Sequence, residues 1–423
     1  MRTPPFDSTR RRIAVSTLSA LAVLAPAVLL GDWPQFGGDG RDFAVADPGL
    51  EPAWPEGGPS VAWKRPLGSG YSGISVVGDT LYTTYRQGDD EIVLAASTAD
   101  GATRWEHRYA APFTPAMSME HGDGPHTTPL VVAGRVFVAG TRGRLLALDA
   151  ATGEVRWTQE LIDELGGTPM DRGYASSPIA YGRNVIASVG GPGRGVMAFD
   201  RETGEAAWSN GDFDGTYSSP FLLRLGGEDQ LVLFTSDSVI GMHPGTGRRL
   251  WSHRHRTQFG LNISVPLWVP ESDDRGILFV SSAYDGGSRA LRLENRGGST
   301  RVEELWAHKQ MRLHIGNAIH RDGMVVASNG DFGPVPLTAV DLAGGEILWR
   351  DRVFGRANLV QAGEHLLLLD EEGDLGIATV TREGIQVHSR GHVFDTRAWT
   401  GPTLVGTRLF ARDQAFLVAL DLP

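Results

Sequence analysis

The sequence contains no cysteine among its 423 residues. This absence excludes disulfide bonds, metal sites built from thiolates, covalent haem attachment and a lipid anchor on an N-terminal cysteine. Lysine is scarce as well, since Lys64 and Lys309 are the only lysines among 39 basic residues. Because disulfide bonds and thiolate metal sites are excluded, the fold must be stabilised by packing and hydrogen bonding. The 55 glycines and 24 prolines indicate a globular chain with many tight turns.

Basic clusters are also missing from the larger part of the chain. The net charge is −11, and the first 27 residues contribute +3 through four arginines and one acid, so the remainder carries −14. An acidic surface repels phosphate backbones, so we expect no nucleic-acid partner.

The N-terminal stretch has the features of an export signal. Residues 10–30, "RRRIAVSTLSALAVLAPAVLL", combine a basic start, an apolar run and the small-residue pattern Ala25-Pro26-Ala27. We predict that residues 1–27 direct the protein to the periplasm or the exterior, with no stable membrane span after their removal. An uncleaved anchor is the alternative. Thr9-Arg10-Arg11 also resembles a twin-arginine signal, so the export route stays open.

A repeat extends through the rest of the sequence. The stretches "STADGATRW", "DAATGEVRW", "DRETGEAAW", "HPGTGRRLW" and "DLAGGEILW" end at Trp105, Trp157, Trp208, Trp251 and Trp349, with degenerate copies ending at Trp306 and His388. Trp63 begins the series. Between these anchors four short apolar strands alternate with turns, at intervals of 39 to 55 residues. This period and pattern predict the four-stranded antiparallel blades of a β-propeller.

The tryptophans are interpreted as structural residues that wedge between neighbouring blades rather than as a cofactor site. This interpretation covers Trp63, Trp105, Trp157, Trp208, Trp251, Trp306 and Trp349. Seven complete blades fit between the anchors, and residues 399–422 supply three strands of an eighth. Residues 60–66, "SVAWKRP", supply its fourth strand, which removes an open sheet edge. We therefore predict an all-β, eight-bladed propeller over residues 60–423, preceded by a strap at 28–59, and we expect a monomer.

The motif "DWPQFGG" at 32–38, followed by copies of "LxALDxxTGExxW", resembles the PQQ-like (pyrroloquinoline-quinone-like) eight-bladed propeller proteins of bacteria. That superfamily includes quinoprotein alcohol dehydrogenases, BamB-like outer-membrane assembly factors without catalytic activity, and exported propellers of unknown role. The dehydrogenase branch implies a quinone on the ring axis, a calcium ion held by Glu, Asn and Asp, and an adjacent pair of cysteines. This chain has no cysteine, and its residues cannot be matched to those calcium ligands.

Residues just before the innermost strand of each blade are expected to surround the mouth of the channel. In chain order they are Tyr71, His126, Tyr174, Tyr217, Asn262, His314, Arg356 and Trp399. The density of rings favours stacking on a planar ligand or gripping a peptide. The alternative is that these side chains simply fill the channel.

Possible metal ligands occur in three places. Met117, Met119, His121 and His126 share one loop and include ligand types that copper accepts. His253 and His255 lie on the same side of a strand but lack a third ligand. The Asp/Gly loops at 284–288 and 329–333 are interpreted as turns, because neither reaches the ligand count of a calcium site. No metal is predicted.

Two functions follow from these observations. The first is an exported, non-catalytic propeller scaffold that binds a protein or cell-envelope partner, as the BamB-like resemblance implies. The second is a PQQ-dependent dehydrogenase acting on an alcohol or a sugar, with PQQ and calcium as cofactors. Fold resemblance alone does not choose between them.

Overall fold

The strands form eight sheets in the part of the chain that the structure describes, each built on four antiparallel strands, and one of these sheets has a fifth, parallel strand. The structure is a computed structural model that describes residues 1–2, 31–55, 57–113, 122–331, 333 and 335–423. Residues 3–27 of the predicted export signal therefore lie outside the described residues, as do Met117, Met119 and His121. Residues 31–423 form one unit. Across the described ranges, no helix is long and apolar enough to cross a membrane.

The first four blades follow one another along the chain. Blade 1 contains β3 (Ser75–Val77), β4 (Thr80–Gln87), β5 (Asp90–Ser97) and β6 (Thr103–Ala110). Blade 2 contains β7 (Leu130–Val132), β8 (Arg135–Ala139), β9 (Arg144–Asp149) and β10 (Val155–Glu160). Blade 3 contains β11 (Ile179–Tyr181), β12 (Asn184–Ser188), β13 (Val196–Asp200) and β14 (Ala206–Asn210). Blade 4 contains β15 (Phe221–Leu225), β16 (Glu228–Phe234), β17 (Ser238–Met242) and β18 (Arg249–Arg254).

The next three blades repeat the same order from the axis outward. Blade 5 contains β19 (Leu267–Ser272), β20 (Arg275–Ser282), β21 (Gly287–Arg296) and β22 (Ser299–His308). Blade 6 contains β23 (Ala318–Arg321), β24 (Met324–Ser328), β25 (Leu337–Asp341) and β26 (Ile347–Asp351). Blade 7 contains β27 (Ala357–Ala362), β28 (His365–Asp370), β29 (Asp374–Val380) and β30 (Ile385–His392).

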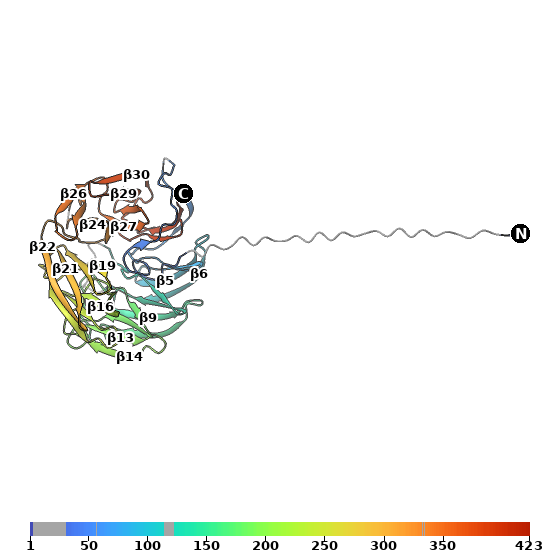
Figure 1. Ribbon diagram of the computed structural model, residues 1–423. Helices are drawn as coiled ribbons and strands as arrows, with labels where there is room; N and C mark the ends of the chain where they lie inside the picture. Colours follow the sequence, from blue (N-terminus) through green and yellow to red (C-terminus); the bar gives the residue numbers. More distant parts are fainter. Residues whose placement is uncertain (3–30, 56, 114–121, 332, 334) are drawn as a thin grey trace. The chain divides into compact units, whose positions relative to one another are not determined.

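Blade 8 closes the ring and joins the two ends of the propeller. It contains β31 (Thr403–Val405), β32 (Arg408–Arg412), β33 (Phe416–Asp421) and, as its outer strand, β2 (Ser60–Pro66). β2 pairs antiparallel with β33, with Trp63 opposite Ala419 and Lys64 opposite Val418. The predicted eight blades and their closure by an N-terminal strand are therefore confirmed. Figure 1 shows the sheets following one another around the ring, from blue to red.

The repeat tryptophans explain the glycine in five of the turns. The indole Nε1 of Trp105 in β6 donates to the carbonyl of Ala150 in blade 2, at 3.0 Å. Its ring covers Gly153, where a Cβ would lie 2.6 Å from the indole. Trp63, Trp157, Trp208 and Trp306 cover Gly101, Gly204, Gly247 and Gly345 of their next blades in the same way. Trp349 donates from Nε1 to the carbonyl of Thr381 in blade 7. The five glycine turns are thus covered by rings of the preceding blade, whereas Gly384 in the turn of blade 7 has no heavy atom of the described residues within 4 Å of the place of a Cβ.

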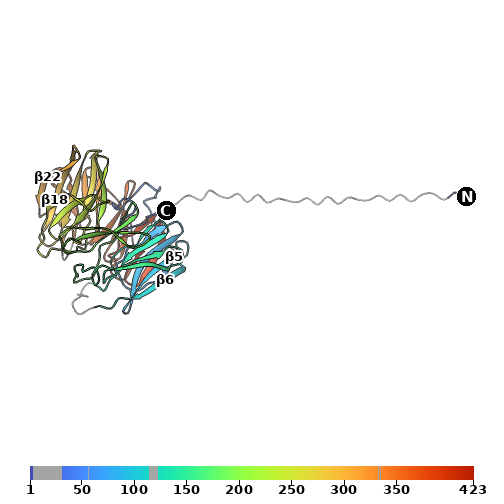
Figure 2. The ribbon, with the colours of Figure 1, turned by 90° about the horizontal axis from the view of Figure 1, so that it is seen from below.

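Trp251 is different, because it turns back onto its own blade. Its Nε1 donates to Gln230 Oε1 at 2.7 Å, and Gln230 in turn donates to Thr300 in β22 at 2.8 Å. The reason is that blade 5 carries a longer β21–β22 hairpin, in which no Thr-Gly turn is available to receive the indole. Figure 2 shows β22 beside β18 of the preceding blade.

The strap, residues 31–59, crosses the axis of the ring. Trp33 exchanges backbone hydrogen bonds with Val76 of blade 1, both at 2.8 Å. β1 (Ala44–Val45) then pairs in parallel with β27, so that blade 7 has a fifth strand on its inner side. The Arg41 side chain of the strap reaches blades 3 and 4, where it donates to the carbonyls of Pro178 and Pro220. Blades 1 and 7, which pair with the backbone of the strap, lie on other sides of the axis. The strap therefore spans the channel.

Candidate functional site

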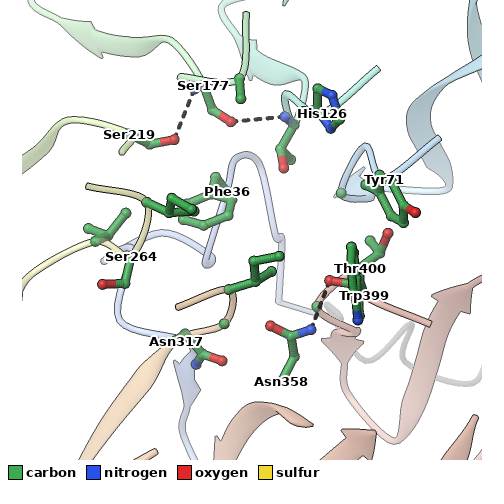
Figure 3. Close-up of a pocket in the computed structure, with 18 of the residues that line it drawn as sticks. Phe36, Tyr71, His126, Ser177, Ser219, Ser264, Asn317, Asn358, Trp399 and Thr400 are labelled. Carbon is green, nitrogen blue, oxygen red and sulfur yellow. Dashed lines mark hydrogen bonds between the residues drawn. The ribbon is translucent and has the colours of Figure 1, made fainter. Parts of the chain in front are cut away.

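A cavity of about 220 Å³ lies on the propeller axis. Its wall is made by the segments that lead into the inner strands, together with the strap. Figure 3 shows Phe36 of the strap in the middle of these segments, with Tyr71, His126 and Trp399 on one side and Ser264 on the other. Small-molecule and side-chain ligands commonly bind in preformed concave hollows of this kind.

Small residues keep the middle of this cavity open. The position directly before the strand-leading proline is Thr128 in blade 2, Ser177 in blade 3, Ser219 in blade 4 and Gly401 in blade 8, while blade 5 has the larger Val265. These residues also hydrogen-bond to one another around the ring: Ser177 Oγ accepts from Thr128 N, and Ser219 Oγ accepts from Ser177 N, both at 2.9 Å. The side chains at these four positions are therefore small, and the hydrogen bonds between blades 2, 3 and 4 hold the backbone in place.

The strap forms the far wall of the cavity. Trp33, Phe36 and Phe43 line it, and the Phe36 and Phe43 rings meet edge to face at 5.1 Å. Arg41 fixes this segment from behind, because its buried guanidinium donates to the carbonyls of Pro178 and, at 2.6 Å, Pro220. Burial lowers the pKa of Arg41 to about 9, so the guanidinium stays charged at neutral pH. The strap thus closes the channel beside the segments that lead into the inner strands.

One side of the mouth is aromatic. The Tyr71 ring stacks on the His126 ring at 5.8 Å and lies 5.5 Å from the Trp399 ring. Trp399 Nε1 donates to Glu371 at 2.8 Å, and His126 Nε2 lies 3.0 Å from the carbonyl of Arg172. Desolvation lowers the pKa of His126 to about 4. This imidazole is therefore neutral at pH 7, and the face that it shares with Tyr71 carries no charge.

The other side of the mouth is polar at its edge. Tyr284 OH and His314 Nε2 lie 2.6 Å apart, and Tyr217 OH donates to Asp171 at 2.5 Å. Burial and the Asp171 carboxylate raise the pKa of the Tyr217 phenol. Both phenols are thus neutral and act as fixed hydrogen-bonding groups.

Five of the eight residues expected at the mouth line the cavity: Tyr71, His126, Tyr217, His314 and Trp399. The structure does not place the other three in its wall. Tyr174 is buried and donates to the carbonyl of Ser188, and Asn262 is buried and donates to the carbonyl of Thr235. Arg356 is buried against His314, with 2.9 Å between Nη1 and Nδ1.

For Tyr174 and Asn262 the difference is one of register. Proline precedes the inner strand in five blades, and the residues three positions before it are His126, Ala175, Tyr217, Ile263 and Trp399. All five line the cavity. Tyr174 and Asn262 each stand one position earlier, and in an extended chain a shift of one residue turns the side chain to the opposite side.

Several wall residues were not expected at the mouth from the sequence. Phe36 belongs to the strap, Tyr284 to a loop within blade 5, and Asn317 and Asn358 to blades 6 and 7, which lack the proline. The proline register would have indicated Ala175 and Ile263, but the position of the strap on the axis depends on tertiary contacts. Arg172 is the one wall residue with a permanent charge among those that the structure describes.

The possible metal ligands do not come together. His253 Nε2 lies 2.9 Å from Glu304, while His255 is buried and accepts from Arg289 Nε at 2.9 Å. Asp285 pairs with Lys309 at 2.7 Å, and Asp331 pairs with Arg312 at 3.5 Å. Over the described residues, no group of three or more His, Asp or Glu side chains is arranged to hold a metal ion.

The donor set of the axial cavity does not fit a calcium-bound quinone. Calcium takes six to eight oxygen ligands, with carboxylates prominent among them. The described wall contains no aspartate or glutamate. The side-chain amide of Asn317 is occupied by the backbone of Leu359, through hydrogen bonds of 2.8 and 2.9 Å. The cavity therefore lacks the oxygen ligands that the resemblance to dehydrogenases would require.

Comparison with known proteins gives two groups of relatives. A family model described as outer membrane protein assembly factor BamB matches residues 89–349. BamB of Shewanella oneidensis is 23% identical over 312 residues, which cover 70% of this chain and 73% of that protein. Quinohemoprotein alcohol dehydrogenase of Comamonas testosteroni is 31% identical over 168 residues, but these cover only 34% of this chain and 23% of the enzyme.

Solved structures show the same fold at low identity. BamB of Moraxella catarrhalis superposes with a TM-score of 0.59 at 17% identity, covering 86% of this chain and all of that structure. The Comamonas testosteroni dehydrogenase superposes with a TM-score of 0.63 at 14% identity, covering 92% of this chain and 80% of the enzyme. At these identities the superpositions establish the propeller and leave the activity open.

Proposed function

The chain belongs to the family of outer membrane protein assembly factors described as BamB, and from this premise we propose that it is an exported, non-catalytic scaffold that binds a protein partner at the cell envelope. Its relatives in that family are named as assembly factors for outer membrane proteins. Residues 1–27 would deliver the chain to the periplasm or the exterior, and the propeller would act there as a monomer.

The axial cavity is the observation that supports this proposal. It is lined by rings at its mouth, closed by the strap, and walled without acidic side chains in the described residues. The polar groups at the mouth are held in hydrogen bonds that position rings, such as Trp399 to Glu371 and Tyr217 to Asp171. Such a surface is suited to binding, because buried aromatic pockets supply most of the affinity of protein interfaces.

A second feature extends the binding surface beyond the cavity. Phe259 is 61% exposed, and its ring meets Tyr284 edge to face at 5.4 Å. Exposure of a phenyl ring to water is unfavourable, and the free energy falls when a partner covers the ring. The mouth and Phe259 together form the surface that we assign to the partner.

The proposal is tested by photo-crosslinking in the intact envelope. A photoreactive residue at Phe259 or Tyr217 should give a discrete adduct with an outer membrane protein or one of its assembly factors. The same residue at Arg301, exposed on the outer strand β22, should give none. Equal labelling at all three positions, or no adduct at the mouth, would contradict the proposal.

A further inference from the structure

The axial cavity has two chemically different walls that face each other. Blades 8, 1 and 2 contribute the rings of Trp399, Tyr71 and His126. Blade 5 contributes Ile263 and Val265 from the opposite side of the ring, and both side chains are only partly buried. Their exposed apolar surface faces the cavity, where covering it would be favourable. Phe36 of the strap lies between these walls, and the space that its ring leaves open is bounded by apolar surfaces that suit a flat apolar group.

The volume of the cavity sets the size of that group. A dry protein cavity of about 150 Å³ is known to accept benzene. The axial cavity measures about 220 Å³, so it has room for a phenyl, phenol or indole ring. It is too small for an element of secondary structure, since an α-helix with its side chains is roughly 10 Å across.

The charge of the wall disfavours a cationic occupant. No acid lines the cavity in the described residues, and Arg172 contributes a positive charge. A lysine or arginine side chain would therefore lose its hydration without gaining a counter-ion. The wall therefore favours a neutral occupant, and an aromatic side chain fits it better than a long basic one.

The polar groups in the middle of the cavity indicate how a peptide would be held. The hydroxyls of Ser177 and Ser219 each accept a backbone N–H, and within the described residues neither donates a hydrogen bond. Each can donate to a carbonyl oxygen entering along the axis. A peptide loop offers such carbonyls together with a side chain at its tip.

We infer that the cavity receives one uncharged aromatic side chain from a loop of the envelope partner, with backbone carbonyls of that loop accepting from Ser177 and Ser219. This inference rests on the proposed function and names the chemistry of the partner. Phe259 would contact the same loop outside the cavity, because its ring stands beside Tyr284 of the wall.

The inference is tested first with a defined probe. N-acetyl-tryptophanamide is neutral and carries both an indole and amide carbonyls, while tryptamine has the same ring with a cationic tail. Ligand-detected NMR on the purified protein should show saturable binding of the first and none of the second. The variant Ile263→Trp fills the cavity and should weaken binding of N-acetyl-tryptophanamide at least tenfold, whereas Val155→Trp, on an exposed position of β10, should bind like the wild type.

A preference for tryptamine, or equal binding by the wild type and Ile263→Trp, would overturn the inference. If Ile263→Trp fails to fold by circular dichroism, Ile315→Trp fills the same space from blade 6. The crosslink at Phe259 then separates the two proposals. An adduct that persists in a cavity-filled variant that no longer binds the probe would mean that the partner touches the mouth without inserting a ring. An adduct missing from the wild type would overturn the proposed function itself.

Discussion

The Trp105 indole of blade 1 lies on Gly153 of blade 2, leaving 2.6 Å between the ring and the place of a Cβ. Gly153 also has a φ of +74°, a conformation that favours glycine. Two independent constraints therefore select glycine at this turn. They explain why the tryptophan and the Thr-Gly turn recur together: one blade supplies the ring, and the next blade supplies the gap that the ring fills.

Substituting Gly153 should therefore destabilise the protein more than substituting a glycine with the same backbone but free space. Gly153→Ala combines left-handed strain with overpacking against Trp105, for an expected loss of about 2–4 kcal/mol. Gly134 has a φ of +72°, and no heavy atom lies within 4 Å of the place that a Cβ would take, so Gly134→Ala should cost only about 1 kcal/mol. Urea unfolding followed by circular dichroism measures both. Equal losses would show that the ring contact contributes nothing.

The same contact predicts the outcome of removing the ring. Trp105→Ala should lower the free energy of unfolding by about 3–5 kcal/mol, because it opens a cavity between two blades. Trp251→Ala is the informative comparison, since that indole bonds to Gln230 of its own blade. In the double variant with Gly153→Ala, the Trp105 effect should be strongly non-additive, whereas the Trp251 effect should add. Additive losses for Trp105 with Gly153→Ala would contradict the coupling.

The fold could be predicted from the sequence because each blade repeats one local pattern. The positions of Trp157 and Gly204 in the repeat, for example, indicate the order of the strands, the type of turn and the spacing of the blades, and the two residues are in contact. The site could be predicted only in part. Tyr174 and Tyr217 occur in similar motifs, yet one is buried in the core and the other lines the cavity. The proline that follows decides between them, since it fixes which side of the extended chain faces the axis.

The strap could not be placed from sequence at all. Phe36 and Arg41 precede the propeller in the chain, and nothing in their local pattern indicates that they reach the axis. Their position depends on carbonyl groups more than 130 residues away, at Pro178 and Pro220. Such contacts become visible only when the ring has closed around them.

Arg41 should be the residue that holds the strap in the channel. Arg41→Ala removes a buried guanidinium from the carbonyls of Pro178 and Pro220, leaving them without donors. We expect a loss of about 2 kcal/mol or more and faster proteolysis of residues 31–45. Arg183→Ala is the control, because that side chain is 76% exposed and pairs with Asp200 at the surface. Unchanged proteolysis of Arg41→Ala would mean that Trp33 and β1 alone fix the strap.

The stability of the protein should fall in mild acid because of His126. Its pKa is about 4 in the folded protein, since burial disfavours the charged ring, and near 6.5 in an unfolded chain. As the pH falls from 6.5 to 4, the unfolded state takes up the proton first. The free energy of unfolding should therefore decrease over this window, by at most about 3 kcal/mol, because the ring is partly open to the cavity.

The variant His126→Gln should reduce that decrease in urea unfolding curves recorded from pH 7 to 4, and the part that remains is expected from His255, whose pKa burial lowers to about 3. His392 provides a control of opposite sign. Its hydrogen bond to Asp374, at 2.7 Å, raises its pKa, so its contribution is complete below pH 6.5 and is lost as the pH rises through the raised value. His392→Gln should therefore weaken the protein below pH 6.5 and leave it nearly unchanged at pH 8. A His126→Gln profile as steep as that of the wild type would contradict the assignment.

Addition of PQQ and calcium should give no stoichiometric complex and no dye-linked oxidation of alcohols or sugars. The reason lies in the wall of the axial cavity, where the described residues include no carboxylate for the cation and the strap residue Phe36 stands on the axis. Equilibrium dialysis measures the binding, and a reconstituted quinohemoprotein alcohol dehydrogenase serves as the positive control for the dye assay. One PQQ bound per chain, with dye reduction that depends on calcium, would overturn the scaffold. It would also show that residues outside the described wall supply ligands to the calcium ion, because the residues within it supply too few oxygen atoms.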